Sequence, residues 1–153
     1  MSKFNVYIKV PDYLDQWLRH EFWDDEEKRI KFPRRSAEHD VLSYFIARRP
    51  PKAEPDMPTA GALPIEVPTF LGRNPAQYNW LPKHGASALV FTIKKRFRKM
   101  LWDELHTIHS DNVQITDLVY AFLYRHGIEP TAKNWETVRQ MYFRARKHNA
   151  PKK

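Results

Sequence analysis

The residues of this chain that are best suited to chemistry are clustered lysines and arginines. In the densest cluster, residues 94–99, five of the six positions are basic. A second cluster lies between residues 139 and 147. Ammonium and guanidinium groups attract the phosphates of nucleic acids, and such contacts add affinity that does not depend on base sequence. Phosphate binding is therefore the first chemistry to consider.

The distribution of charge along the chain favours the same chemistry. Residues 91–153 hold 13 basic and 6 acidic residues, which gives this part +7 of the net charge of +8. An acidic polymer is the commonest reason for such an asymmetry. The alternative is that the charge only keeps the protein in solution.

The second cluster is predicted to lie on a helix from Trp135 to His148. Its outer face would carry two rows of side chains at spacings of three and four residues, a surface suited to phosphates and bases. The candidate nucleic-acid-binding residues are Arg139, Phe143 and Arg146 in one row, Gln140, Arg144 and Lys147 in the next, and Lys94, Lys95, Arg98 and Lys99 in the first cluster. The alternative is that basic residues at the end of a helix only meet its dipole, and that residues 94–99 are a solvated helix face.

Other chemistries are less well supported by the residues. The carboxylates of residues 24–27 could serve a metal-dependent nuclease, although four consecutive side chains cannot all face one ion and a solvated linker is the preferred interpretation. His106, His109 and Asp111 have a spacing compatible with a metal, but no further ligand is identifiable. The chain has no cysteine, and its four glycines form no phosphate-binding loop. We expect no enzyme activity, no metal and no cofactor.

Three aromatic residues offer a different mode of binding. Tyr78, Trp80 and Trp102 could stack on unpaired bases, which would favour single strands or RNA. Packing in the core is the preferred interpretation.

The N-terminal part is predicted to contain strands and helices in alternation. Its helices would follow Pro11 and the N-cap Ser36, and its strands are expected at Phe4 to Val10, Arg29 to Pro33 and Leu63 to Val67. The prolines that flank and interrupt the last strand, Pro64 and Pro68, suggest an edge position or the strand ends. Most of the twelve prolines lie between residues 50 and 82, which excludes a continuous helix there.

Three helices are predicted to close the chain. Apolar residues recur at three and four positions from Leu89 to Ile108, a second helix ends at Gly127, and Asn134 is expected to cap the third. Residues 86–149 resemble the homeodomain-like and Myb-like helix-turn-helix domains. The resemblance implies that the last helix enters the major groove of DNA, although the linker 128–134 is longer than the usual turn.

The predicted fold class is α+β and mostly helical, with a small N-terminal sheet and two helices followed by a C-terminal three-helix unit. The expected divisions are a strand-helix portion (1–69), a proline- and aromatic-rich connector (70–85), the three-helix unit (86–149) and a tail (150–153). The predicted function is that of a nucleic-acid-binding accessory or regulatory protein, with duplex DNA as the expected partner. The alternative is a protein-interaction or assembly module without nucleic-acid binding.

The sequence also bears on where the protein would act. The start of the chain lacks the apolar run of a signal peptide, and no stretch approaches the roughly 20 apolar residues that span a bilayer, so we expect a cytoplasmic protein without a membrane partner. As a small, cysteine-free basic protein with an N-terminal strand-helix portion and a basic helical tail, the chain is similar to uncharacterised proteins of bacterial prophages and mobile elements. This similarity implies no activity.

Overall fold

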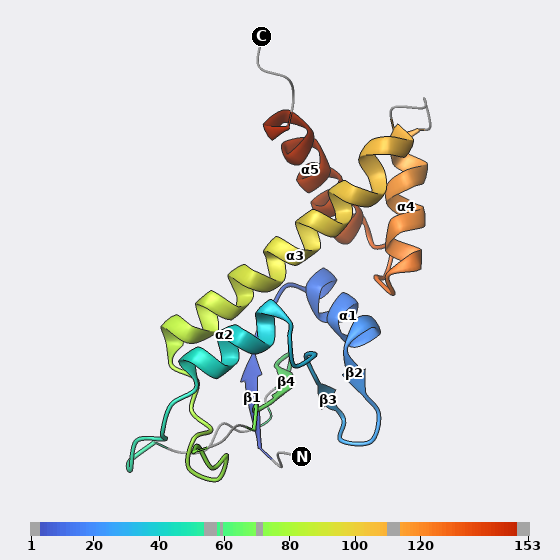
Figure 1. Ribbon diagram of the computed structural model, residues 1–153. Helices are drawn as coiled ribbons and strands as arrows, with labels where there is room; N and C mark the ends of the chain where they lie inside the picture. Colours follow the sequence, from blue (N-terminus) through green and yellow to red (C-terminus); the bar gives the residue numbers. More distant parts are fainter. Residues whose placement is uncertain (1–3, 54–57, 59, 70–71, 110–113, 150–153) are drawn as a thin grey trace. The chain divides into compact units, whose positions relative to one another are not determined.

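The computed structural model describes residues 4–149 except 54–57, 59, 70–71 and 110–113. It has the predicted α+β class, with a small sheet in the N-terminal part and a helical C-terminal part (Figure 1). The chain forms two compact units. The first comprises Met1–Pro11 and Glu21–Ile93, and the second comprises Asp12–His20 and Lys94–Lys153. These units divide the chain differently from the boundaries at 69 and 85, because residues 12–20 belong to the second unit.

The first unit is built on a four-stranded sheet in the order β1-β4-β3-β2 (Figure 1). The strands are β1 (Asn5–Ile8), β2 (Trp23–Asp24), β3 (Arg29–Ile30) and β4 (Leu63–Glu66). β4 pairs antiparallel with β1 and parallel with β3, and β2 pairs antiparallel with β3. Alternate residues of β1 and β4 are buried, as the period of two in their apolar residues predicts. The short strand β2 was not predicted.

The expectation of an edge strand for Pro64 is wrong, because β4 is flanked on both sides; Pro64 is the second residue of this four-residue strand. The Val67 amide donates to the Phe4 carbonyl, so by alternation the nitrogen of Pro64 faces away from β1. On that side β3 pairs with β4 only at Ile65. The proline is tolerated because no ladder bond is needed from its nitrogen.

The acidic residues 25–27 lie in the turn of the β2-β3 hairpin, and Asp24 is the last residue of β2. The Lys28 amide donates to the Asp24 carbonyl, and the Glu26 amide donates to the Asp24 carboxylate. Residues 25–28 are exposed. The segment is therefore solvated, as predicted, but it closes a hairpin instead of linking a helix to a strand.

Two helical segments complete the first unit. Helix α2 (Ala37–Phe45) begins at the predicted N-cap, where Ser36 Oγ accepts from the His39 amide at 3.1 Å. Helix α3 (Lys83–His109) begins in this unit and continues into the second. The Phe45 ring meets the His84 ring edge-on, with the centroids 5.4 Å apart. A Cβ on Gly85 would lie 2.7 Å from Phe45 Cβ, so glycine permits this close approach.

The second unit is helical. It contains α1 (Asp12–Glu21) up to His20, α3 from Lys94 onward, α4 (Ile115–Arg125) and α5 (Ala132–His148). Phe97 lies at the centre of its core and is fully buried. The Phe97 ring centroid is 5.2 Å from those of Tyr13 and Trp17 and 5.7 Å from that of Phe122, all in edge-to-face geometry. Three helices are thereby joined through one aromatic side chain.

The connection between α4 and α5 departs from the prediction at one point. Gly127 has φ of 68°, and the Ile128 amide donates to the Leu123 carbonyl, so α4 ends in a Schellman motif at the predicted glycine. The N-cap of α5 is Thr131, not Asn134, because Thr131 Oγ accepts from the Asn134 amide at 3.1 Å. The Asn134 side chain is buried instead and donates to the Glu129 carbonyl at 2.9 Å.

Candidate nucleic-acid interface

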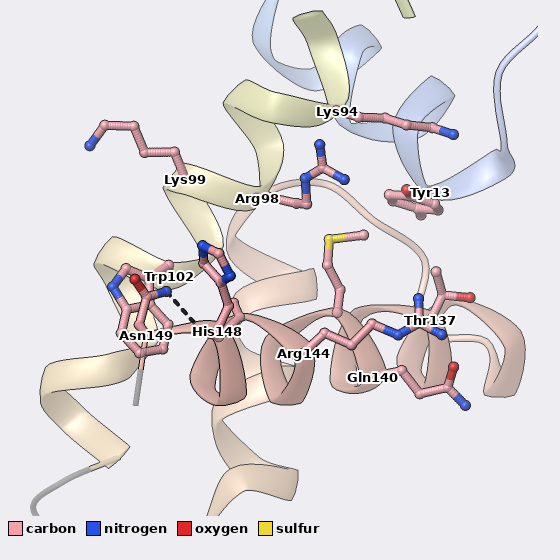
Figure 2. Close-up of a pocket in the computed structure, with 12 residues that line it drawn as sticks. Tyr13, Lys94, Arg98, Lys99, Trp102, Thr137, Gln140, Arg144, His148 and Asn149 are labelled. Atoms are coloured by element: carbon pink, nitrogen blue, oxygen red, sulfur yellow. Dashed lines mark hydrogen bonds between the residues drawn. The ribbon is translucent and has the colours of Figure 1, made fainter. Parts of the chain in front are cut away.

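A groove in the second unit collects basic residues from two helices, and we call it the basic groove (Figure 2). Its volume is about 750 Å³. It is lined by Tyr13 of α1, by Lys94, Arg98, Lys99 and Trp102 of α3, and by Thr137, Gln140, Met141, Arg144, Ala145, His148 and Asn149 at α5 and its C-cap. All twelve residues belong to the second unit.

The α3 wall of the basic groove follows from helical geometry. Ile93, Phe97 and Leu101 are fully buried, so they define the inner row of the helix. The next residue after each lies about 100° further around the axis, which places Lys94, Arg98 and Trp102 in a row that flanks the core. Arg98 and Lys99 are exposed, and Lys94 is half-buried.

The α5 wall arises in the same way. Asn134, Val138 and Tyr142 are the buried residues of α5. Thr137, Met141 and Arg144 lie on one flank of that row and line the groove. Figure 2 shows Thr137 and Arg144 on this wall. Two clusters separated by some forty residues in the chain therefore border one concave surface.

The basic groove is electropositive. Three of its lining residues carry full positive charge without an acidic partner, since Lys94, Arg98 and Arg144 form no ion pair within the described part of the chain. Lys99 Nζ lies 2.7 Å from the Asp103 carboxylate, but both side chains are largely exposed, and such a pair is weak in water. None of the twelve lining residues is acidic.

The floor of the groove is apolar and ordered by packing. The Trp102 ring stacks on the His106 ring, with centroids 4.8 Å apart and planes 10° apart, and lies 6.0 Å from the Tyr142 ring. Met141 and Ala145 add aliphatic surface. Burial raises the pKa of the Tyr13 hydroxyl above its ordinary value of 10.0, while the nearby Arg98 charge lowers it. Tyr13 is therefore neutral at physiological pH and keeps its hydroxyl proton.

The structure brings together five of the ten predicted site residues: Lys94, Arg98, Lys99, Gln140 and Arg144 line the basic groove. The other five, Lys95, Arg139, Phe143, Arg146 and Lys147, do not line it. The Arg139 guanidinium lies over the rings of Trp135 and Phe143, at 5.7 and 5.0 Å from their centroids. Arg139 is thus held on the opposite flank of α5.

The exposed face of the first half of α5 carries a carboxylate. Glu136 Oε1 accepts from Gln140 Nε2 at 3.0 Å and lies 3.5 Å from Arg139 Nη1. Gln140 and Arg139 therefore both already interact with the carboxylate of Glu136.

Sequence reasoning missed several lining residues, among them Tyr13, Met141 and His148. Tyr13 is separated from the rest by about 80 residues, and no local pattern joins it to them. Met141 and His148 have the helical spacing of Arg144, at i−3 and i+4, so the flank of α5 could have been recognised once its inner row was known.

The described residues lend no support to the alternative sites. No group of three histidine, cysteine, aspartate or glutamate side chains within them is placed to hold a metal. The His106 ring contacts the Trp102 carbonyl through Nδ1 at 2.6 Å, while the His109 side chain and Asp111 lie outside the described residues. The backbone of Trp80 pairs with that of Ala47 in an isolated bridge, and the Trp80 side chain is half-buried.

Comparison with protein-family models, with curated proteins and with solved structures finds no match to this chain. Among the helices of the described residues, none combines the length and the apolar character that crossing a membrane requires. Functional inference therefore depends on the geometry and charge of the basic groove.

Proposed function

We propose that this protein binds nucleic acid, as an accessory or regulatory protein, and that the basic groove holds the phosphates. One observation carries the proposal: basic residues from two separate clusters of the sequence line one groove, and none of the groove's lining residues is acidic. Lys94 and Arg98 face the groove from α3, and Arg144 faces it from α5 (Figure 2). Phosphate contacts of this kind supply most of the affinity of non-specific nucleic-acid binding.

The arrangement suits phosphates better than isolated surface charges do. Arg98 and Arg144 offer planar guanidinium groups that can bind a phosphate with two parallel hydrogen bonds. Because they have no acidic partner among the described residues, no existing ion pair must be broken before a phosphate binds. Gln140 lies on the same wall, and the second amide hydrogen of its Nε2, beyond the one donated to Glu136, can add a hydrogen bond to a phosphate or sugar oxygen.

The test is a fluorescence-anisotropy titration of labelled nucleic acids with three proteins: the natural sequence, R98Q/R144Q, and the control R34Q/R35Q. The control removes two exposed arginines from the first unit and so lowers the net charge equally. We expect binding by the natural protein and the control, with a large loss in the groove variant. Equal affinity of the two variants would refute the assignment of the groove, and no binding at low salt would refute the function.

A second candidate function is protein interaction or assembly, and exposed aromatic residues on α4 favour it. Tyr120 and Tyr124 are one helical turn apart, with exposed fractions of 47% and 89%. Tyrosine is enriched in protein interfaces. Light scattering across a range of concentrations tests this candidate: a rising mass that Y124S abolishes supports it, and a constant mass speaks against self-assembly.

A further inference from the structure

We infer that the basic groove takes a single nucleic-acid strand, with its bases on the apolar floor and its phosphates on the basic rim. The inference rests on the proposed function and adds to it the class of nucleic acid that is bound. It differs from the duplex DNA that the sequence alone favoured. Three features of the groove carry it: its composition, its size, and the length of its walls.

The composition of the groove matches an unpaired nucleotide. Trp102, Met141 and Ala145 provide apolar surface in the same groove that Arg98 and Arg144 line. A duplex turns its sugars and phosphates outward and covers its base faces by stacking, so an apolar floor would meet charged backbone. An unpaired strand exposes base faces, which gain by contact with apolar and aromatic side chains.

The floor is rigid enough to act as a platform. The Trp102 ring stacks on the His106 ring and also lies near the Tyr142 ring, and these contacts fix its orientation at the groove. Met141 also lines the groove and offers a flexible thioether, which makes favourable contacts with aromatic rings of varied shape. Such a floor suits bases in general and does not select one of them.

The size of the groove limits what can enter it. A volume of about 750 Å³ falls in the range of pockets that enclose one organic ligand. The major groove of B-DNA is about 12 Å wide and itself admits a whole helix. A duplex can therefore contact the rim, but it cannot reach the floor.

The length of the groove matches a few phosphates. From Lys94 to Trp102 the α3 wall runs roughly 12 Å, and from Thr137 to Asn149 the α5 wall runs roughly 18 Å, at 1.5 Å per residue. Each nucleotide of a stacked strand advances about 3.4 Å along the helix axis, so walls of this length run beside about four or five nucleotides. The groove offers four lysines and arginines: Lys94, Arg98, Lys99 and Arg144.

The face of α5 that a major groove would receive is less favourable for nucleic acid. Glu136 lies on its first half and is bonded to Gln140 and Arg139. Inserting this face would bring the carboxylate close to the negative potential of the duplex and disturb both contacts. The flank that borders the basic groove has no such carboxylate among its lining residues.

The test measures the affinity of the full-length protein for a labelled oligothymidylate of about twelve nucleotides, for the matching oligouridylate, and for a duplex of equal length. We expect one of the single strands to bind at least about tenfold more tightly than the duplex, the equivalent of one stacked base. M141Q should narrow this difference by weakening single-strand binding alone. Circular dichroism would confirm that the variant is folded.

The outcomes separate this inference from the proposed function. Equal or tighter binding of duplex, weakened by R98Q/R144Q, would overturn the single-strand inference and leave nucleic-acid binding intact. Failure to bind any of the three nucleic acids would overturn both. Displacement of the single strand by polyglutamate at equal charge concentration would show that charge alone is recognised, which also overturns the inference.

Discussion

Salt should weaken the binding of a single strand by an amount that the basic groove fixes in advance. Each phosphate contact on a single strand contributes about −0.7 to the slope of log affinity against log salt concentration. Three lining cations, Lys94, Arg98 and Arg144, have no acidic partner among the described residues, and Lys99 must exchange Asp103 for a phosphate. Three to four contacts give a slope between about −2.1 and −2.8.

The slope translates into a measurable loss of affinity. A fourfold increase in salt should weaken binding by about 18-fold to 50-fold for the natural protein. In R98Q/R144Q one or two contacts remain, so the same increase should weaken binding by only about 3-fold to 7-fold. The double variant should also bind about 25-fold less tightly at 0.1 M salt, since each lost contact accounts for about fivefold there.

The assay is a series of anisotropy titrations with a labelled oligothymidylate at several salt concentrations, with R34Q/R35Q as the control. The control should keep the slope of the natural protein, because its substitutions lie outside the basic groove. If the groove variant keeps the full slope, or if the control loses as much slope as the groove variant, the phosphate contacts lie elsewhere and the reasoning is refuted.

The remaining predictions concern the folding of the second unit. F97A should lower the free energy of unfolding by about 3 to 5 kcal/mol, because it empties the centre of the aromatic core; a loss below about 1 kcal/mol in urea denaturation would contradict that role. T131A should lower the free energy of unfolding by about 1 kcal/mol, because it removes the N-cap of α5. An unchanged denaturation midpoint would contradict the role of Thr131 as the N-cap. Because the pKa of Tyr13 is raised, its contribution to stability should be complete below pH 10 and decline as the pH rises through the folded pKa. R98Q removes a charge that lowers this pKa, so tyrosinate absorbance should appear at higher pH in the variant, and a shift to lower pH would contradict the assigned contact.

Regular elements were predictable from local patterns in this chain. The apolar spacing from Leu89 onward indicated α3, Ser36 indicated the start of α2, and Gly127 indicated the end of α4. These features depend on neighbours within one or two helical turns. The two-residue strand β2 is too short to show a period in the sequence. The position of Pro64 in a central strand depends on the pairing of β4 with β3, which lies more than 30 residues earlier in the chain.

The candidate site was predictable only in part, for a related reason. Both basic clusters were evident in the sequence, but the flank that each helix turns toward the other depends on how the helices pack. Arg144 and Arg139 are five residues apart on one helix, yet the first lines the basic groove and the second lies over Trp135 and Phe143. Tyr13 reaches the groove through the packing of α1, which no local pattern reveals.

The central claim, that nucleic acid occupies the basic groove, is tested most directly by nuclear magnetic resonance of the isotopically labelled protein during titration with an oligothymidylate. We predict that the shifted amide signals concentrate in residues 94–102 and 137–149, with Arg98 and Arg144 among the most affected. Signals of the β2-β3 hairpin, residues 23–30, should remain in place. Shifts that fall on the hairpin or on α2, with the walls of the groove unaffected, would contradict the claim.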